Sequence, residues 1–575
     1  MAILQAIHNI AEICAQKNVK TAILCPGSRS AALTISMARH PEIKTYSISD
    51  ERSAGFIGLG IAQVTKETVA LICTSGTASY NFAPAVAEAF FQEIPLLVLT
   101  ADRPPEWIHQ YDGQTIYQEN IFGKHVKKSF SLPADYNHAD AVWQVERVVN
   151  EAINLSQSFP KGPVHINVPI REPFYPTEHE VVRFDKQVRI IENASTVKKL
   201  PNEFFEKFYE IWQSCERKLI IVGQQQESQL SKVLKNISDE FSIPVLSDII
   251  SNVSFENVIS AHDVFLSSKN ENFLESLAPD LIVTCGKSVI SKNLKQFIRK
   301  YRPRYHFHIQ ENPELIDPFQ TLTHKVEVSE QYFFETVFGD LDLMKFKEGD
   351  DEDQNDAYFA LWKAANQKSV LKLDNFLLNS LYSEFKTVKN VLDKTPENSI
   401  FHLGNSMSVR YANLIGLSAS TNIEIFANRG TSGIDGTLSS AVGNALSTNR
   451  LVICLIGDVS FFYDRNAFWN TYLPGNLRVV LINNQGGNIF RIIDGPNRQA
   501  ELKDYFVTEQ NYTAKLTCEE AGVEYMQVSN EQELEKSLES FFKPDNQAKL
   551  LELIVDGEIS AEVFREYKKL FAHFV

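Results

Sequence analysis

The amino-acid sequence predicts an α/β fold of three doubly wound parallel-sheet domains in series. Three observations predict it: the length of 575 residues, short apolar runs that end on Gly, Asp, Asn or Pro, and helix-length stretches between most of these runs. A single hydrophobic core stops growing at about 250–300 residues, so a chain of this length is expected to divide into domains. Continuous apolar runs separated by helices are typical of parallel strands that are buried on both faces.

The apolar runs form three sets along the chain. The first set includes VKTAILCPGS and PLLVLTAD, the second KLIIVG and LIVTCG, and the third LVICLIGD and LRVVLINN. A polar, proline-containing stretch follows the first set, and the acidic run KEGDDEDQNDA at residues 347–357, which indicates a solvated linker, follows the second. We therefore expect a first domain over residues 1–182, a central structural domain over residues 183–350 and a third domain over residues 351–575.

Composition and charge argue against several classes of function. The formal net charge of −16 makes nucleic acid an unexpected partner, because phosphate binding requires a basic surface. The seven cysteines include no Cys-x-x-Cys pair, which favours buried thiols in a reducing compartment. The N-terminus lacks the basic start of a signal peptide, and no apolar stretch is long enough to cross a bilayer. We expect a cytoplasmic protein without membrane insertion.

Two neighbouring runs of the third set end on Asp458 and Asn484. In open α/β sheets, ligands bind beyond the carboxyl ends of the strands. Mg²⁺ prefers oxygen ligands and combines one or two carboxylates with phosphate oxygens, so this pair favours a metal that anchors a diphosphate. Gly486 allows the backbone to approach and offer a carbonyl oxygen. The alternative is that Asp458 caps the next helix and that Asn484 belongs to a turn.

This pattern of Gly-Asp followed by Asn-Asn resembles the signature of thiamine diphosphate-dependent enzymes. Such enzymes need a carboxyl group facing the aminopyrimidine ring of the cofactor. Its hydrogen bond to N1′ favours the imino tautomer, which removes the proton from C2 of the thiazolium ring. Glu51, in the stretch SISDERSAGFIGLGIA, is the candidate for this carboxyl group. The alternative is an ordinary acidic residue that the helix dipole stabilises.

Further stretches sharpen the resemblance. They are CPGSRSAALT (25–34), DERSAGF (50–56), TSGTASYNFAPAVAEA (74–89), LTADRPPE (99–106), HINVPIREP (165–173), GNSMSVR (404–410), NRGTSGIDGT (428–437), IGDVSFFYD (456–464) and NNQGGNIF (483–490). Together they resemble the 2-succinyl-5-enolpyruvyl-6-hydroxy-3-cyclohexene-1-carboxylate (SEPHCHC) synthases of menaquinone biosynthesis. The resemblance covers the first and third domains, and in the central domain it is limited to SVISKNLKQF.

The resemblance implies a transferase that decarboxylates 2-oxoglutarate on thiamine diphosphate and adds the succinyl carbanion equivalent to isochorismate by 1,4-addition. Glu51 would be catalytic, and Asp458, Asn484 and Gly486 would hold Mg²⁺ or Mn²⁺. The residues implied to contact the cofactor are Thr74, Ser75, Gly76, Gln114, Ser406, Ile434, Gly457, Asp458, Val459, Ser460, Asn484, Gly486, Ile489 and Phe490. Those implied to contact the substrates are Ser28, Arg29, Arg103, Gln114, Lys292, Ser406, Arg410, Arg429 and Phe490. The resemblance also implies a homodimer or a dimer of dimers, with active sites at the subunit interface.

The residue types support this assignment. Both implied substrates are dicarboxylates, and the planar guanidinium group of arginine binds carboxylates bidentately. The four implied arginines lie beside loops that contain Gly, Ser or Pro, although each alone would be read as a surface charge. Ile434 matches the bulky residue that separates the two cofactor rings, and a packed core isoleucine is the alternative. Burial alone would explain Ile489 and Phe490 almost as well.

The sequence departs from the family pattern at three positions and in the stretch YDGQTIYQ, which differs from the usual small-residue form around Gln114. Val459 stands where Gly is common, Asn293 follows Lys292 where an Arg is usual, and Gln485 replaces a more familiar Asn or Asp. Two other functions stay open at this point. One is another thiamine-dependent 2-oxoacid decarboxylase, or a carboligase similar to acetohydroxyacid synthase. The other is a noncatalytic regulatory subunit, against which the retained acidic and amide residues argue.

Overall fold

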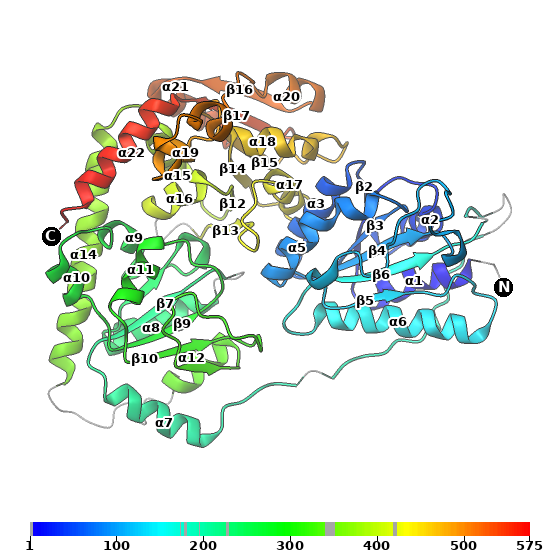
Figure 1. Cartoon of the computed structure of the whole chain (residues 1–575), viewed down its shortest axis with the longest axis horizontal. Coiled ribbons are helices and arrows are strands. Elements are labelled where there is room, and N and C mark those ends of the chain that lie inside the picture. The colour runs from blue at the N-terminus through cyan, green and yellow to red at the C-terminus, as the bar shows by residue number, and fades with distance from the viewer. Residues whose placement is uncertain are drawn as a thin grey trace.

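The computed structural model contains three parallel β-sheets, each flanked by helices, in the order of the three sets of apolar runs (Figure 1). It describes residues 4–172, 174–176, 181–194, 196–225, 229–339, 351–417 and 422–574, with the side chains of residues 351–355 left out. Every strand pair within the described sheets is parallel. The prediction of three doubly wound domains in series is confirmed.

The first sheet has six strands in the order β2-β1-β3-β4-β6-β5. They are β1 (Thr21–Leu24), β2 (Lys44–Ser47), β3 (Val69–Cys73), β4 (Leu96–Asp102), β5 (Ser129–Ser131) and β6 (Val164–Pro169). The helices are α1 (Gln5–Gln16), α2 (Ala31–Arg39), α3 (Glu51–Thr65), α4 (Ala78–Asn81), α5 (Ala83–Gln92) and α6 (Ala139–Gln157), with short turns η1 (Pro105–Trp107) and η2 (Gly123–His125). All residues of β3 and β4 are buried, as the continuous apolar runs predict.

The central sheet has five strands in the order β11-β10-β9-β7-β8. They are β7 (Lys218–Val222), β8 (Val245–Ser247), β9 (Leu281–Cys285), β10 (Tyr305–Ile309) and β11 (His324–Val326). The helices are α7 (Asn202–Gln213), α8 (Leu230–Phe241), α9 (His262–Phe265), α10 (Glu271–Ser276), α11 (Lys292–Lys300) and α12 (Glu330–Gly339), with the turn η3 (Ile249–Ser251). Residues 181–194 contain no helix or strand and belong to the extended segment that leads from the first domain to α7 (Figure 1).

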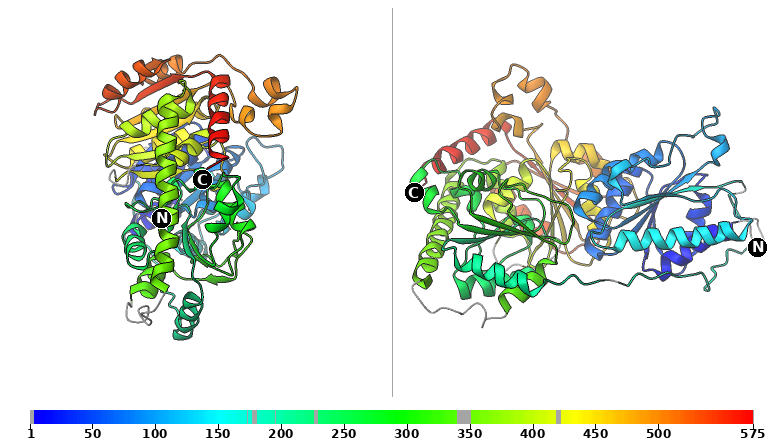
Figure 2. Two further views of the ribbon diagram at one scale, coloured as in Figure 1. Left: turned by 90° about the vertical axis from the view of Figure 1, so that its left-hand side faces the viewer. Right: turned by 60° about the horizontal axis from the view of Figure 1, so that its bottom comes forward.

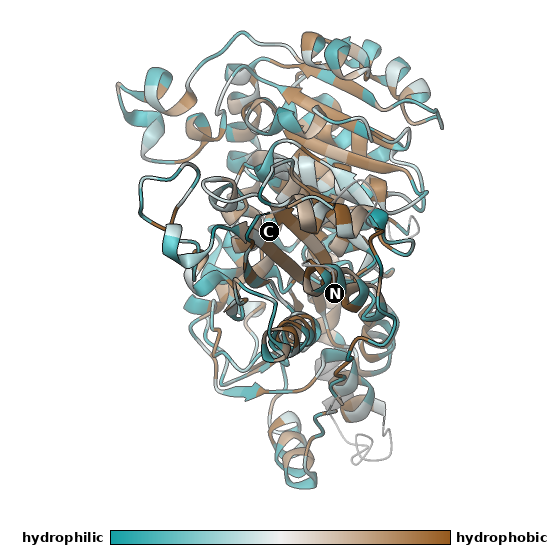
Figure 3. Cartoon of the chain, turned by 90° about the vertical axis from the view of Figure 1, so that its right-hand side faces the viewer, coloured by the Kyte–Doolittle hydropathy of each residue, from teal (hydrophilic) through white to brown (hydrophobic). Residues whose placement is uncertain are grey.

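The third sheet has six strands in the order β13-β12-β14-β15-β17-β16, which repeats the topology of the first sheet. They are β12 (Ile400–Leu403), β13 (Glu424–Ala427), β14 (Val452–Gly457), β15 (Leu477–Asn483), β16 (Glu524–Val528) and β17 (Lys549–Ile554). The helices are α14 (Asp351–Asn379), α15 (Glu384–Lys394), α16 (Met407–Ile415), α17 (Thr437–Leu446), α18 (Asp458–Asp464), α19 (Ile489–Ile492), α20 (Lys515–Ala521), α21 (Glu531–Phe541) and α22 (Gly557–Phe571). The short turns are η4 (Arg465–Phe468), η5 (Pro496–Arg498) and η6 (Leu502–Val507). Figure 3 shows hydrophobic residues concentrated in the strands, between helices of mixed polarity.

The acidic run at residues 347–357 is only in part the linker that the sequence indicated. Residues 347–350 lie outside the described residues, and from Asp351 the chain forms the 29-residue helix α14. This helix contacts α9 of the central domain and α15 of the third domain, and it appears as the long helix in the left view of Figure 2. A run of acidic residues is compatible with a helix whose apolar residues follow later, here from Tyr358 and Trp362, which are buried in the core.

Helices α3 and α17 join the first domain to the third within one chain. They lie side by side in Figure 1 and form an extensive contact through small residues. A Cβ atom at Gly60 would overlap the carbonyl group of Ser440, and one at Gly443 would overlap that of Ile57. The Asn444 amide donates a 2.9 Å hydrogen bond to the carbonyl oxygen of Gly60. The two helix backbones therefore approach closely because no side chain separates them.

A series of hydrogen bonds connects the α3–α17 contact to the interior of the third sheet. His402 of β12 is buried, and its Nδ1 lies 2.8 Å from Oδ1 of Asn444. Because the amide nitrogen of Asn444 donates to Gly60, its oxygen accepts, and Nδ1 of His402 must be the donor. His402 Nε2 is then the unprotonated nitrogen, and it has no hydrogen-bond partner among the described residues. Burial lowers the pKa of His402 to about 4.

Across the described part of the chain, the structure has no helix that combines the length and the apolar character needed to span a membrane.

The close approach of α3 and α17 predicts that Gly443→Ala destabilises the protein strongly. The added methyl group would meet the Ile57 carbonyl and force the helices apart, at a cost of about 1–3 kcal/mol or more. Urea unfolding would measure this change. Gly339→Ala is the control, because a Cβ at Gly339 meets no atom within 4 Å. Equal unfolding free energies for both variants and the unmodified chain would contradict the proposed contact.

The buried neutral imidazole of His402 predicts acid sensitivity. Between the ordinary pKa of 6.5 and the lowered pKa of about 4, the unfolded chain binds a proton that the folded chain does not. The free energy of unfolding therefore decreases as the pH is lowered from 6.5 towards 4. This one group contributes about 1.4 kcal/mol per pH unit. In His402→Asn the amide nitrogen can replace Nδ1 as the donor without titrating, so unfolding free energy should depend less on pH. Parallel pH profiles for the two proteins would disprove the assignment.

Candidate active site

Asp458 lies where strand β14 meets helix α18, and its buried carboxylate connects two strand ends. One oxygen accepts a 2.7 Å hydrogen bond from the backbone N–H of Val459, and the other accepts a 2.8 Å bond from that of Gly486. Strand β14 pairs with β15, with Gly457 beside Ile482, so Asp458 and Asn484 follow adjacent strand ends. Asp458 is the first residue of α18 and follows the N-cap residue Gly457, so its role is more than the capping that was the alternative. It ties the loop after β15 to the end of β14.

Asn483 and Asn484 have different partners. The Asn483 amide donates to Glu552 and to the Tyr512 carbonyl, and its oxygen accepts from the Gln485 N–H, so this residue forms the turn. The Asn484 amide nitrogen donates a 2.8 Å bond to Glu384. Its oxygen is buried and has no hydrogen-bond partner in the described part of the chain. A buried acceptor without a hydrogen bond destabilises the folded state, and a ligand bound to this oxygen would remove that destabilisation.

The local charges favour a cation at this position. Burial raises the pKa of the Asp458 carboxyl to about 7, and burial together with the nearby Asp458 charge raises that of Glu384 to about 7. No cluster of three or more His, Cys, Asp or Glu side chains suited to a metal occurs among the described residues. One carboxylate and one unpartnered amide oxygen fit a Mg²⁺ or Mn²⁺ ion whose other positions are filled by phosphate oxygens.

Glu51 is the first residue of α3, at the junction between the first and third domains. The capping role belongs to Asp50, whose side chain accepts from the N–H groups of Arg52 and Ser53. The Glu51 carboxylate accepts a 3.1 Å bond from Asn81. Its two neighbours in sequence both reach the third domain: Asp50 accepts from Asn466, and Arg52 donates to the carbonyl oxygen of Tyr463. Within a single chain, the residues on either side of Glu51 therefore contact the C-terminal end of α18 and the following turn η4.

The loop after β3 carries Thr74, Ser75 and Gly76, all of which are buried. The backbone N–H of Gly76 donates to Gln118, whose amide group also donates to the carbonyl oxygen of Ala101 and to Asn167. Gln118 therefore ties three strand ends of the first sheet together. Gln114 is exposed, and its backbone lies against Gly76, where a Cβ atom would come within 3.4 Å of the Gln114 Cα.

The loop between β13 and α17 presents Ile434 from the third domain. Its backbone carbonyl accepts a hydrogen bond from Ser460. The side chain of Ile434 is 38% exposed, so it is not the packed core residue that was the alternative to a cofactor contact. Asn405 holds the same loop through the carbonyl groups of Asn428 and Gly433. Ile489 and Phe490 are half-buried, and Phe490 packs against Phe506 at 5.6 Å between ring centres.

Glu88 of helix α5 holds this loop from the first domain. Its buried carboxylate accepts bonds of 2.7 Å and 2.6 Å from the backbone N–H groups of Gly430 and Thr431 and a 2.6 Å bond from the Thr431 hydroxyl. A Cβ atom at Gly430 would lie 2.8 Å from the Glu88 carbonyl oxygen. The first domain therefore fixes the position of the loop that carries Arg429 and Ile434.

The four arginines form two neighbouring pairs. Burial lowers the pKa of Arg29, and the nearby charge of Arg103 lowers it further; burial likewise lowers that of Arg429, with Arg410 adding to the effect. Arg29 donates to the Ile170 carbonyl, and Arg103 pairs with Asp112 at 2.8 Å. Arg410 donates to the carbonyl oxygen of Ser406, whose backbone φ of +71° is unusual for a residue with a side chain. Like charges placed together in this way suit an anionic ligand.

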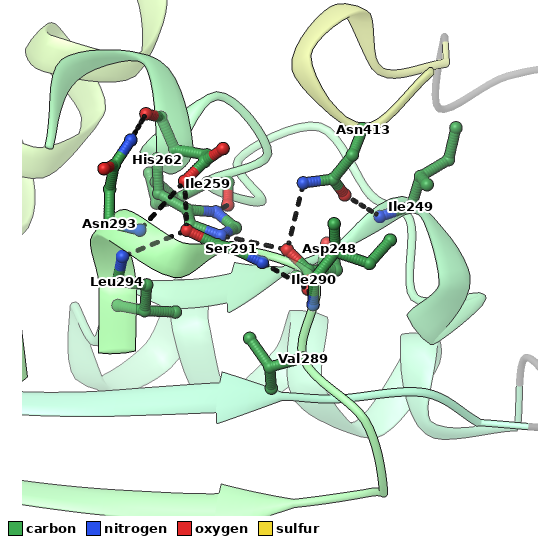
Figure 4. Close-up of polar contacts among 12 residues, drawn as sticks. Asp248, Ile249, Ile259, His262, Val289, Ile290, Ser291, Asn293, Leu294 and Asn413 are labelled. Carbon is green, nitrogen blue, oxygen red and sulfur yellow. Dashed lines mark hydrogen bonds and ion pairs between the residues drawn. The ribbon is translucent and has the colours of Figure 1, made fainter. Parts of the chain in front are cut away.

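The central domain contributes the N-terminus of α11 through a buried polar network (Figure 4). Asp248 accepts from His262 at 3.2 Å and from Asn413 of the third domain at 3.2 Å. The Asn293 amide donates a 2.9 Å bond to the carbonyl oxygen of Asp263. The side chain that replaces the family arginine therefore has a structural partner inside the central domain. Lys292, next to it, is exposed, as is Ser28 of the first domain.

Several residues of this region escaped sequence analysis. Glu384, Asn488, Glu88 and Gln118 hold the strand-end loops but do not themselves end an apolar run. Glu88 and Asn488 lie inside two motifs of the resemblance, TSGTASYNFAPAVAEA and NNQGGNIF, and Gln118 lies four positions after Gln114, so the sequence offered a weak signal for these three. Glu384 lies about a hundred positions from the amide that it binds, in a helix without any motif, so the sequence carried no signal for it.

Comparisons with known proteins agree with this arrangement. The family described as thiamine pyrophosphate enzyme, N-terminal TPP binding domain, matches residues 5–124. The middle domain of thiamine pyrophosphate enzymes matches residues 197–338, and the C-terminal TPP binding domain matches residues 409–552.

Full-length relatives carry one name. A 2-succinyl-5-enolpyruvyl-6-hydroxy-3-cyclohexene-1-carboxylate synthase of Cytophaga hutchinsonii is 42% identical over 98% of this chain and 99% of its own length. Proteins of the same name from Flavobacterium johnsoniae and Porphyromonas gingivalis are 36% and 34% identical, over 98% and 96% of this chain and 98% and 94% of their own lengths. The resemblance inferred from the sequence is thereby confirmed, and the chain belongs to the SEPHCHC synthase family of thiamine diphosphate-dependent enzymes.

Proposed function

We propose that this enzyme decarboxylates 2-oxoglutarate and adds the succinyl carbanion equivalent to isochorismate by 1,4-addition, forming 2-succinyl-5-enolpyruvyl-6-hydroxy-3-cyclohexene-1-carboxylate for menaquinone biosynthesis. The observation that carries this proposal is the shared name of relatives that align along nearly the whole chain. Local geometry supports it, because Glu51 and the Asp458–Asn484 pair come from domains that pack together in one chain.

The diphosphate end of the cofactor belongs, in this proposal, to the third domain. Asp458, the orphaned oxygen of Asn484 and the carbonyl oxygen of Gly486 would hold Mg²⁺ or Mn²⁺. Only glycine fits at position 486, because a Cβ there would lie 2.6 Å from the carbonyl oxygen of Val507. Gly457, Val459 and Ser460 surround Asp458 and would contact the diphosphate, with Ile434, Ile489 and Phe490 as apolar neighbours of the rings.

The first domain would supply the proton-handling group. When bound, thiamine diphosphate supplies a thiazolium carbon that, once deprotonated, takes up a 2-oxo acid and lets carbon dioxide leave. Glu51 would keep a proton shared with the aminopyrimidine nitrogen N1′ and so make the neighbouring amino group a base. Thr74, Ser75 and Gly76 would lie beside the same ring, with Gln114 next to Gly76.

The arginines would bind substrate carboxylates. Arg29 and Arg103 of the first domain, and Arg410 and Arg429 of the third, lie in two pairs of like charge that carboxylates would relieve. Arg103 would exchange its present partner Asp112 for a substrate. Ser28, Ser406 and Lys292 would add hydrogen bonds or charge, and we propose that Lys292 acts without the guanidinium group that Asn293 lacks.

We also propose a homo-oligomer, a dimer or a dimer of dimers, located in the cytoplasm. Exposed aromatic and aliphatic side chains gather near α18, η4 and α20, where Phe462 contacts Tyr512 at 5.7 Å between ring centres. They are Tyr463, Trp469, Tyr512 and Leu516. An exposed apolar group of this kind favours contact with a second copy of the chain.

Glu51→Gln tests the proton-handling role. The variant should bind thiamine diphosphate and Mg²⁺ as the unmodified enzyme does, because the proposed diphosphate anchor is unchanged. Its turnover should fall by about 10²–10⁴-fold, the usual contribution of a general acid–base group. Calorimetry would measure binding, and a product assay would measure turnover. Glu67→Gln, an exposed acid just beyond the other end of α3, is the control. Near-normal turnover in Glu51→Gln would remove this residue from the mechanism.

Substrate dependence separates the proposal from other thiamine-dependent reactions. With 2-oxoglutarate and isochorismate together, we expect the joined product and equimolar carbon dioxide. Rapid release of carbon dioxide from 2-oxoglutarate without isochorismate would indicate a simple decarboxylase, and use of a second 2-oxo acid would indicate an acetohydroxyacid synthase-like reaction. A chain that binds no thiamine diphosphate in the presence of Mg²⁺ would instead be a noncatalytic subunit.

A further inference from the structure

We propose that Glu384 is a positioning residue for the metal site, and that its carboxylate turns the amide of Asn484 so that the amide oxygen is available to the ion. This inference rests on the proposed metal site and adds a residue to it. Glu384 itself would not touch the metal or the cofactor.

One oxygen of Glu384 accepts two hydrogen bonds. The Nδ2 atoms of Asn484 and Asn488 lie 2.8 Å and 2.6 Å from it. A carboxylate offers only acceptors, so it can bind the nitrogen end of a primary amide but not the oxygen end. Glu384 therefore fixes which end of the Asn484 amide faces away from it. That end is the buried oxygen, which has no hydrogen-bond partner among the described residues.

The carboxylate is itself held firmly. Glu384 is the first residue of α15, it is buried, and its backbone N–H donates a 3.1 Å bond to the Ser560 hydroxyl of α22. The next residue, Phe385, is fully buried in the core. An acidic side chain at the start of a helix is also favoured by the helix dipole. Glu384 thus has the fixed position that a group orienting a metal ligand requires.

A second Asn–Glu pair at the same strand end shows what is particular to Asn484. Asn483 donates a 2.7 Å bond to the buried carboxylate of Glu552 on β17, in the same way that Asn484 donates to Glu384. The oxygen of Asn483, however, accepts from the Gln485 N–H at 3.1 Å. Two adjacent amides are therefore oriented by two carboxylates, and of these two only the Asn484 amide keeps an unpartnered oxygen. Asn488, the other amide that Glu384 holds, likewise has a buried oxygen without a partner among the described residues.

Three substitutions distinguish orientation from charge. Glu384→Ala removes the acceptor and leaves the Asn484 amide free to rotate. Glu384→Gln removes the charge but keeps a carbonyl oxygen that can accept both Nδ2 groups. Glu384→Asp keeps the charge and withdraws the acceptor by one methylene group. Orientation by a hydrogen bond predicts weak metal binding for the alanine and aspartate variants and nearly normal binding for glutamine.

The measurement is Mn²⁺ affinity, followed by electron paramagnetic resonance with thiamine diphosphate present and no substrate. Loss of an outer partner of a metal ligand typically weakens metal affinity by about 10–100-fold, and this fall is expected for Glu384→Ala. Glu552→Gln is the matched control, because it alters the equivalent carboxylate of Asn483 and should leave Mn²⁺ affinity unchanged. Circular dichroism would verify folding, and if Glu384→Ala does not fold, the aspartate and glutamine variants decide.

The outcomes are distinguishable. Failure of the unmodified protein to bind Mn²⁺ would refute the proposed metal site itself. If the unmodified protein binds and the folded alanine and aspartate variants bind equally well, Glu384 does not position the ligand. Equal weakening in Glu384→Gln and Glu384→Ala would show that the charge matters rather than the orientation, and a similar fall in Glu552→Gln would show a general loss of local structure. Each of the last three results would overturn the proposed role of Glu384.

Discussion

The contact of helices α3 and α17 across Gly60 and Gly443 is the constraint on which the rest of the structure depends. Because backbone meets backbone there, the first and third domains have little freedom to slide against each other. Each helix follows the second strand in its domain, and the two sheets share one strand order. The starts of the two helices therefore lie close together, which brings Arg52 to the carbonyl oxygen of Tyr463 in α18 and Phe56 against Gly436. The resemblance implied active sites at a subunit interface. The contact between helices α3 and α17 is formed within one chain.

Buried carboxylates hold the loops of this region in place. Glu88 binds the backbone of the loop after β13, Asp458 binds the loop after β15, and Asp464 binds the N–H and hydroxyl groups of Ser439 at the start of α17. A hydrogen bond to a charged group is stronger than one between neutral groups, and every residue except proline supplies a backbone N–H. The strand-end loops can therefore consist of small residues, which leave room for a ligand, and still keep a fixed shape.

Much of this arrangement could be predicted from the sequence, because the residues concerned directly follow the strands that position them. Asp458, Asn484 and Ile434 follow apolar runs in glycine-containing loops, and in a parallel sheet such positions come together at one edge. Glu384, Glu88 and Gln118 act across the fold on residues far away in the sequence, so no spacing could indicate their roles. The acidic run before Tyr358 resembled a linker because its polarity hides the start of α14, whose apolar face begins only later. Asn293 stands where the family pattern has an arginine, and a long-range contact that the sequence did not indicate gives its amide a partner in the Figure 4 network.

A crystal structure with thiamine diphosphate and Mg²⁺ bound would test the central claim most directly, namely that two domains of this fold converge on one cofactor. The arrangement described above predicts a single metal ion between Asp458, the Asn484 oxygen and the carbonyl oxygen of Gly486. It also predicts that a Glu51 carboxylate, from this chain or a second copy, lies within about 3 Å of the aminopyrimidine nitrogen N1′. A cofactor held by the third domain with no Glu51 carboxylate near its ring would contradict it.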